Sequence, residues 1–189
     1  MAVPTTEVTG HQTEIPGLLW FDVTSVGDDR GWFQEKFHKA KLVAAGMPED
    51  FTVIQNSLAF NKKGVTRGFH AEPWDKYVST INGNAFVAYV DLRKGETFGK
   101  VFTLELNPQK AVFVPRGVGN SYQCLSEDLY YLYSVNQHWT PDAYEKYCFV
   151  NLADPTIGVE WPIPLDQAIL SDKDKSHPTL NAITPMEFA

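Results

Sequence analysis

The fold is decided by the stretch Lys76-Tyr-Val-Ser-Thr-Ile-Asn-Gly-Asn-Ala-Phe-Val-Ala-Tyr-Val-Asp-Leu92. Its two halves, residues 76–81 and 85–92, are rich in the β-branched and aromatic side chains that favour strands. Between them, Asn82-Gly83-Asn84 carries the Asn-Gly pair typical of a type I′ turn. The sequence therefore predicts two strands that pair directly as a hairpin. Because residues 85–92 are nearly all apolar, we expect this strand to be buried on both faces.

Short runs of the same character fill the chain from Phe51 onward and are separated by Gly, Pro and Asn. One helix is predicted, over 35–47, with Gly46 near its end. The segment after Pro155 holds four further prolines, so we expect it to wrap the body as ordered coil. Many short strands without βαβ alternation predict an all-β jelly roll or a related small barrel. The further strands are expected over 52–60, 65–70, 100–106, 111–114, 121–125, 129–135 and 145–150.

The length of 189 residues predicts a single domain over 1–189. Sixteen Lys and Arg against 23 Asp and Glu give a net charge of -7, which disfavours nucleic acid and membrane surfaces as partners. An anionic ligand would therefore need a local basic cluster. Cys124 and Cys148 are too few for a disulfide framework, and the N-terminus lacks a signal-type apolar segment. The sequence thus favours the cytoplasm.

His70 has the most suggestive surroundings of the five histidines, because it follows Arg67 in a predicted strand. Residues three apart point to opposite faces of a regular strand, but a bulge at Gly68 would bring both side chains into one pocket. A single histidine in a strand is also commonly a hydrogen-bonded core residue, and that interpretation stays open. The other candidates, Lys76, Tyr133, Arg30 and the run 171–174, are by themselves ordinary core or surface residues.

A metal site is the main competing interpretation, because many jelly rolls bind a metal through histidines and a carboxylate. Here His70-Ala71-Glu72 offers one imidazole and one carboxylate, too few for a transition metal without distant ligands. We therefore expect no metal. Cys124 has no His or cation close to it in the sequence, which argues against a cysteine nucleophile, and no glycine-rich phosphate loop is present.

Taken together, several motifs resemble the dTDP-4-dehydrorhamnose 3,5-epimerase family, whose members are cupin-type jelly rolls that need no metal. The resemblance covers nearly the whole chain and implies an all-β cupin-type jelly roll with a short N-terminal helix and a C-terminal coil segment. The motifs that carry it are Asp28-Asp-Arg-Gly-Trp-Phe-Gln-Glu35, Gly64-Val-Thr-Arg-Gly-Phe-His70, Val90-Asp-Leu-Arg93, Thr97-Phe-Gly99, Val114-Pro-Arg-Gly117, residues 133–141 and Leu170-Ser-Asp-Lys-Asp174.

The resemblance implies that His70 is the general base, that Asp174 orients it, and that Tyr133 is the acid on the opposite face. These roles suit the chemistry. The implied substrate is a nucleotide sugar with a ketone at C4. This ketone acidifies the hydrogens on C3 and C5 of the sugar, and the enolate formed when one is removed needs stabilisation where its negative charge develops. Lys76 is a suitable cation beside that oxygen. A neutral imidazole takes a proton readily near neutral pH.

The family pattern also implies substrate contacts outside the reacting centre. Arg30 and Arg67 would offer planar forks to a pyrophosphate. Trp139 stands where the family usually has a tyrosine that stacks on thymine, and Asn120 stands where a histidine is usual. The full set of implied substrate-binding residues is Arg30, Glu35, Gln55, Arg67, Asn120, Trp139 and Lys173.

The leading hypothesis is a cofactor-free isomerase that inverts C3 and C5 of dTDP-4-dehydro-6-deoxy-glucose, in the route to dTDP-rhamnose. A mono-epimerase or ketoisomerase acting on a related dTDP-sugar is the alternative within enzymes. The non-enzymatic alternative is a jelly roll without catalytic activity that binds a sugar nucleotide or a protein partner. A homodimer is expected from the resemblance alone.

Overall fold

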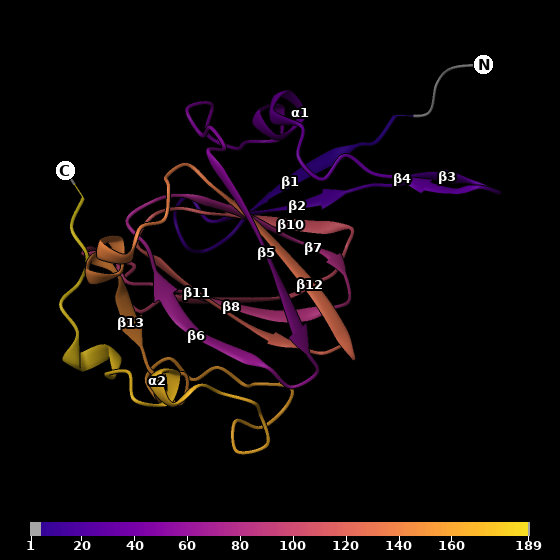
Figure 1. The fold of residues 1–189 in the computed structure, drawn as a ribbon. Coiled ribbons are helices and arrows are strands. Elements are labelled where there is room, and N and C mark those ends of the chain that lie inside the picture. Colours follow the sequence, from indigo (N-terminus) through magenta and orange to yellow (C-terminus); the bar gives the residue numbers. More distant parts are fainter. Residues whose placement is uncertain (1–4, 189) are drawn as a thin grey trace.

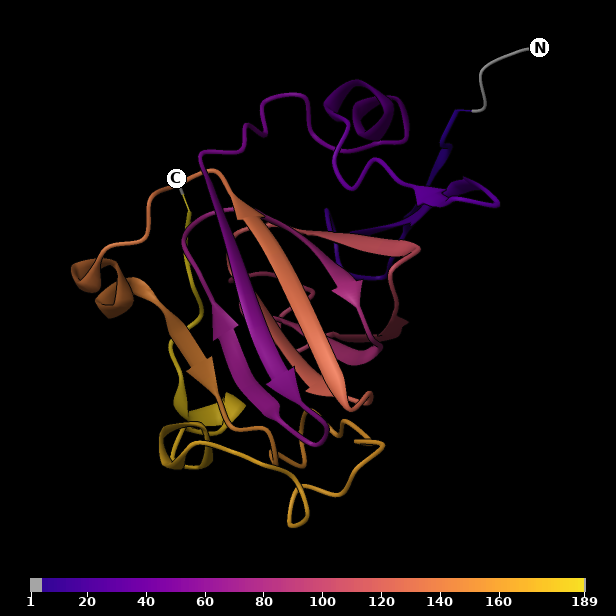
Figure 2. The same cartoon turned by 45° about the vertical axis from the view of Figure 1, so that its right-hand side comes forward.

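The computed structural model describes residues 5–188, which form two antiparallel sheets packed face to face (Figures 1 and 2). One sheet has six strands in the order β1-β2-β10-β7-β12-β5, and the other has five in the order β13-β6-β11-β8-β9. The predicted all-β jelly roll is confirmed. The strands are β1 (Val8–Gln12), β2 (Leu19–Val23), β3 (Val26–Asp28), β4 (Gly31–Phe33), β5 (Gln55–Lys62), β6 (Thr66–Ala71), β7 (Lys76–Asn82), β8 (Ala85–Asp91), β9 (Val101–Leu106), β10 (Lys110–Val114), β11 (Val118–Cys124), β12 (Asp128–Val135) and β13 (Cys148–Val150).

The central strand β8 is buried on both faces, as its unbroken apolar sequence predicts. Val87 and Tyr89 point into the core between the two sheets. Ala88 and Val90 point the other way, into a second core beneath the C-terminal segment. That segment supplies Leu180 and other apolar side chains to the outer face of the five-stranded sheet, so the sheet is covered on both sides.

The predicted direct pairing of the strands on either side of Asn82-Gly83-Asn84 is wrong. β7 pairs with β10 and β12 in one sheet, whereas β8 pairs with β9 and β11 in the other. The turn crosses between the sheets because its polar groups bond to the neighbouring corner of the chain. Asn84 N donates to Ser126 Oγ at 2.8 Å, and Asn84 O accepts from Leu125 N at 3.0 Å. The positive φ of Gly83, +83°, serves this crossing.

The N-terminal region differs from the prediction in two ways. Strands β1 and β2 extend the six-stranded sheet, and β3 and β4 form a separate hairpin that projects from the body (Figure 1). The helix α1 covers Lys39–Ala44 rather than 35–47, because the His38 side chain caps its start.

After Pro155 the chain is mostly coil, as predicted, with a helical turn α2 (Asp172–Lys175) and a short 3-10 turn at Leu180–Ala182. No helix within residues 5–188 is long and apolar enough to cross a membrane.

The core around β9 gives a direct test of the packing. Leu106 is fully buried between the sheets, so Leu106→Ala should lower the free energy of unfolding by about 2–5 kcal/mol. Thr103→Ala, at an exposed position on the same strand, is the control and should change it by less than about 0.5 kcal/mol. Urea unfolding measures both. A loss below about 1 kcal/mol for Leu106→Ala would contradict this packing.

Candidate active site

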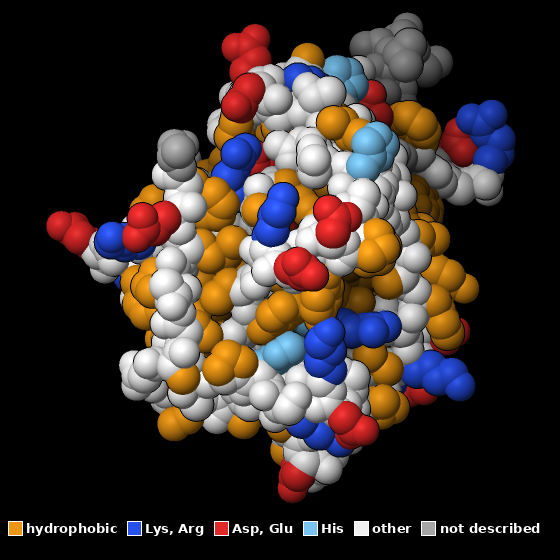
Figure 3. Space-filling model, turned by 60° about the vertical axis from the view of Figure 1, so that its left-hand side comes forward, with side chains coloured by type: hydrophobic (Ala, Val, Ile, Leu, Met, Phe, Trp, Pro, Cys, Tyr) orange, Lys and Arg blue, Asp and Glu red, His pale blue; other side chains and the backbone are white. Residues whose placement is uncertain are grey.

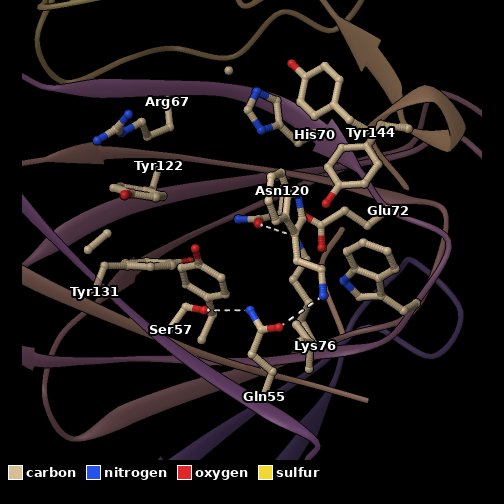
Figure 4. Close-up of a pocket in the computed structure, with 17 residues that line it drawn as sticks. Gln55, Ser57, Arg67, His70, Glu72, Lys76, Asn120, Tyr122, Tyr131 and Tyr144 are labelled. Atoms are coloured by element: carbon tan, nitrogen blue, oxygen red, sulfur yellow. Dashed lines mark hydrogen bonds and ion pairs between the residues drawn. The ribbon is translucent and has the colours of Figure 1, made fainter. Parts of the chain in front are cut away.

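A cavity of about 490 Å³ opens between the two sheets, within the size range of small-molecule sites. Strands β5, β7 and β12 form one wall and β6 and β11 the other, and the segment around residues 139–147 forms part of the rim (Figure 4). Figure 3 shows Lys and Arg side chains beside a histidine on a surface that is otherwise rich in hydrophobic side chains. Among the predicted site residues, those that line the cavity are Gln55, Arg67, His70, Lys76, Asn120, Tyr133 and Trp139.

A β-bulge brings Arg67 and His70 to the same cavity, as the sequence suggested. In the pairing of β6 with β11, His70 is opposite Asn120 and Arg67 is opposite Tyr122. Two residues of β6, Gly68 and Phe69, therefore face the single residue Ser121 of β11. The extra residue changes the alternation of side chains. As a result Phe69 enters the core, while Arg67 and His70 both face the cavity.

The side chain of Asp174 reaches the bulge from α2 and contacts His70. His70 Nε2 lies 3.2 Å from Asp174 Oδ1. A Cβ at Gly68 would lie 2.2 Å from the same oxygen, so only glycine leaves room for the carboxylate. Ser171 Oγ donates to Asp174 Oδ2 at 2.7 Å. The contact uses Nε2 of the imidazole, which leaves Nδ1 as the ring nitrogen for a ligand in the cavity.

The hydrogen bonds to Asp174 outweigh its burial. Burial by itself raises the pKa of this carboxyl, but hydrogen bonds from His70 and Ser171 and the charge of a protonated His70 lower the pKa to about 2. Asp174 is therefore ionised near neutral pH. An anion beside Nε2 favours the tautomer in which Nε2 carries the proton and Nδ1 has the free electron pair.

A second histidine, His177, contacts the same carboxylate and was missed in the sequence. Its Nε2 lies 3.4 Å from Asp174 Oδ1, and its side chain is only 7% exposed. The ring stacks on Phe149, with centroids 4.7 Å apart. Burial and the nearby His70 lower the pKa of His177, which keeps it neutral. The only sequence signal was its position three residues after Asp174.

Lys76 is buried on β7 and is held by two oxygens. Its Nζ lies 2.9 Å from Glu72 Oε1 and donates to Asn120 Oδ1 at 3.0 Å (Figure 4). The carboxylate of Glu72 compensates the buried ammonium charge, a role that the sequence did not reveal. Asn120 Nδ2 has no hydrogen-bond partner within residues 5–188, so it is a donor available to a ligand. The two residues together present positive charge and a donor to one part of the cavity.

Tyr133 faces the cavity from β12, in the sheet opposite the strand that carries His70. The two side chains thus lie on different walls. Trp139 is half exposed near the mouth, where its backbone N–H donates to Gln55 Oε1 at 3.0 Å. Gln55 in turn donates to Ser57 Oγ at 3.1 Å, which fixes the orientation of its amide. An aromatic ring at the mouth offers a flat surface to a planar base.

The remaining predicted substrate contacts are divided between the rim and the projecting hairpin. Lys173 lies over the ring of Tyr144, which lines the cavity, with Nζ 3.9 Å from the ring centroid. Arg30 lies at the end of the β3–β4 hairpin, pairs with Asp28 and is 90% exposed. Glu35 lies at the base of that hairpin and pairs with Lys41. Neither Arg30 nor Glu35 lines the cavity.

The jelly roll, the open cavity between its sheets and the acid-base side chains on the two walls of that cavity define a class of ligand-binding β protein suited to proton-transfer chemistry. The family model described as dTDP-4-dehydrorhamnose 3,5-epimerase matches residues 12–182. The chain therefore belongs to the dTDP-4-dehydrorhamnose 3,5-epimerase family, an isomerase family, as its motifs indicated.

Individual relatives agree with this assignment. The chain is 48% identical over 178 residues to the protein RmlC homolog of Streptococcus pyogenes, covering 92% of this chain and 90% of that protein. RmlC from Streptococcus suis in complex with dTDP-D-xylose superposes with a TM-score of 0.90 at 43% identity. The match covers 95% of this chain and 94% of that chain. RmlC from Legionella pneumophila in complex with dTDP-4-keto-L-rhamnose gives a TM-score of 0.85 at 26% identity. This match covers 97% of this chain and 100% of that chain.

The low pKa of Asp174 has a measurable consequence for stability. Because the folded-state pKa lies below the value of about 4 in the unfolded chain, the carboxylate stabilises the fold above that pH. This contribution is lost as the pH falls from about 4 to about 2. After allowance for screening by solvent in the cavity, it is on the order of 1–2 kcal/mol.

Urea unfolding of the wild type and Asp174→Asn between pH 5 and pH 2 tests this. The difference in free energy of unfolding should shrink toward the acid end. Asp172→Asn, which removes an exposed carboxylate from the same helical turn, is the control for the change in charge. A difference that stays constant over the whole range would show that Asp174 does not titrate as described.

Proposed function

We propose that this protein inverts C3 and C5 of dTDP-4-dehydro-6-deoxy-glucose, giving dTDP-4-dehydro-rhamnose in the route to dTDP-rhamnose. Membership of the epimerase family supports the reaction, and the dTDP-sugars bound to the two RmlC relatives support the substrate class. The observation that carries the proposal is the placement of His70 and Tyr133 on opposite walls of one cavity, with Asp174 behind the histidine.

The base in this mechanism is His70. Its Nδ1 takes a proton from the carbon beside the C4 ketone, and the electron pair of the broken C–H bond moves into an enolate. Asp174 remains ionised and stabilises the imidazolium through Nε2. After the proton is released to solvent, the same base acts at the second carbon. A base or acid in such a position contributes about 10²–10⁴-fold to the rate.

The enolate oxygen is stabilised by Lys76, with the free amide donor of Asn120 beside it. One well-placed donor of this kind contributes roughly 2.7–4 kcal/mol to the transition state. Tyr133 then donates its phenolic proton to the opposite face of the carbon, which inverts the centre, and recovers a proton from solvent. The cavity wall that carries the base thus differs from the wall that carries the acid, as inversion requires.

The nucleotide part of the substrate is bound toward the mouth of the cavity. Arg67 supplies a guanidinium to the pyrophosphate, and Asn61 Oδ1 fixes its orientation by accepting from Nε at 3.2 Å and from Nη2 at 3.0 Å. Trp139 stacks on the base. Lys173 and Gln55 complete the contacts from the rim. The few cations that converge here allow an acidic protein to hold a dianionic ligand.

The working form in this proposal is a homodimer, and the exposed apolar residues support it. Trp32 and Phe33 on the projecting hairpin are 66% and 62% exposed, and Leu58 and Phe60 form an exposed apolar surface on the edge strand β5. Exposed clusters of this kind mark contact surfaces. A second copy that covers them would bring Arg30 of one protomer toward the cavity of the other.

The base is tested by turnover of dTDP-4-dehydro-6-deoxy-glucose, with the product identified by NMR. His70→Ala should lower kcat by at least about 10²-fold while the fold is retained. His11→Ala is the matched control, because His11 also pairs with a carboxylate, Asp22, but lies outside the cavity, and it should leave turnover unchanged. Near-normal turnover by His70→Ala would exclude this residue as the base. A product inverted at a single carbon would favour the mono-epimerase alternative.

The dimer is tested by light scattering coupled to gel filtration. The wild type should elute with twice the mass of the chain, and the double variant Trp32→Ala/Phe33→Ala should shift toward the monomer. Arg30→Ala should raise KM, although Arg30 lies outside the cavity of its own protomer. A fully active monomeric wild type would contradict the dimer.

A further inference from the structure

Three potential metal ligands meet where α2 contacts β6. They are the imidazoles of His70 and His177 and the carboxylate of Asp174, and one ligand atom from each lies within 4.8 Å of the other two. The carboxylate oxygen Oδ1 is 3.2 Å from one nitrogen and 3.4 Å from the other. The sequence offered only His70 and a neighbouring carboxylate, too few for a metal, and the two further ligands come from more than a hundred residues away.

A second observation points to a ligand at this place. His177 Nε2 is buried and has no hydrogen-bond partner in the described part of the chain, because its contact with Asp174 is poorly directed. Leaving a buried polar group unpaired costs free energy, so such atoms are rare without a functional reason. The stacking of the ring on Phe149 holds this nitrogen at the carboxylate.

The distances suit a tetrahedral ion. Zinc binds histidine nitrogen and carboxylate oxygen at about 2.0–2.2 Å, so neighbouring ligand atoms in a tetrahedron lie about 3.3–3.5 Å apart. Two of the three separations are already close to this value, and the third, between the two imidazoles, is at most 4.8 Å. We propose that His70, Asp174 and His177 form a site for Zn²⁺ or a similar transition metal, and that metal bound there inhibits the enzyme.

Inhibition follows from the tautomer of His70. In the metal-free protein the Nε2 proton faces Asp174, and Nδ1 keeps the electron pair that accepts the substrate proton. A metal on Nε2 takes the electron pair of that nitrogen, so the proton of the neutral ring moves to Nδ1. Nδ1 then has no free pair, and His70 cannot act as a base. The metal therefore competes with catalysis without occupying the substrate cavity.

The ligand set also selects the kind of metal. Two imidazoles with one carboxylate suit zinc, copper and nickel, whereas magnesium and calcium require mostly oxygen ligands. The single carboxylate leaves a net positive charge at the site when a divalent ion binds. A fourth coordination position remains for water.

Binding and inhibition are measured separately on protein that has been treated with a chelator and desalted. Calorimetric titration with Zn²⁺ should give one ion per chain. Turnover of dTDP-4-dehydro-6-deoxy-glucose should fall as that site fills, return on addition of EDTA, and be unaffected by Mg²⁺. A metal-dependent jelly-roll enzyme would behave in the opposite way and lose its activity to the chelator.

The decisive variant is His177→Gln, which removes one ligand. It should bind Zn²⁺ at least about tenfold more weakly, since loss of even an outer-shell partner costs 10–100-fold in affinity. His177→Phe, which keeps the stacking on Phe149, repeats the test with a different replacement. His11→Gln removes a histidine from another His–Asp pair and should retain the wild-type affinity. Each variant is compared with its own rate in EDTA.

The metal site is excluded if Zn²⁺ fails to bind at one ion per chain or if both His177 variants bind it as tightly as the wild type. The inhibition is excluded if the bound ion leaves turnover unchanged. The inhibition measurement rests on the proposed function, whereas the binding measurement does not. Absence of turnover both before and after treatment with the chelator would therefore refute the proposed substrate, while the titration would still decide the metal site.

Discussion

The arrangement of the cavity depends on the contact between the Asp174 carboxylate and the bulge of β6. This contact joins the C-terminal segment to the five-stranded sheet, and it is possible only because Gly68 leaves space for the carboxylate. The same bulge turns Arg67 and His70 toward one cavity. One irregular residue in a strand thus determines the position of His70, the tautomer of its ring and the direction of the Arg67 side chain.

The two sheets separate the chemical roles. The five-stranded sheet carries His70 and Asn120, and the six-stranded sheet carries Lys76 and Tyr133. A jelly roll suits a reaction that needs different groups on two faces of a sugar ring, because side chains from both sheets point into the space between them. The buried ammonium of Lys76 is tolerated there because Glu72 compensates its charge.

Much of this arrangement could be predicted from the sequence. Alternation, β-branched content and turn residues located the strands from β5 onward, and the unbroken apolar run of β8 indicated burial on both faces. The Asn-Gly turn misled, because its backbone preference is local, whereas the pairing depends on Ser126 and Leu125 at a distant corner. The strands before α1 were missed, since they are short and several of their residues are exposed.

Within the site, the resemblance indicated several of the residues that line the cavity, but not the contacts between distant segments. The roles of Glu72 and His177 could not be predicted from the sequence, because only folding places Glu72 beside Lys76 and His177 beside Asp174. The position of Arg30 is the converse case, because its motif is recognisable but the fold of the chain does not bring it to the cavity. Such relations arise from the packing of distant segments, which no local pattern encodes.

The central claim is that His70 removes the proton on one face and Tyr133 returns it on the other. Proton NMR of dTDP-4-dehydro-6-deoxy-glucose in D₂O with Tyr133→Phe tests it most directly. Without the acid, the account predicts exchange of the C3 hydrogen for deuterium while the carbon keeps its configuration, and His70→Ala should give no exchange. Inversion by Tyr133→Phe at the wild-type rate, or exchange by His70→Ala at that rate, would contradict the account.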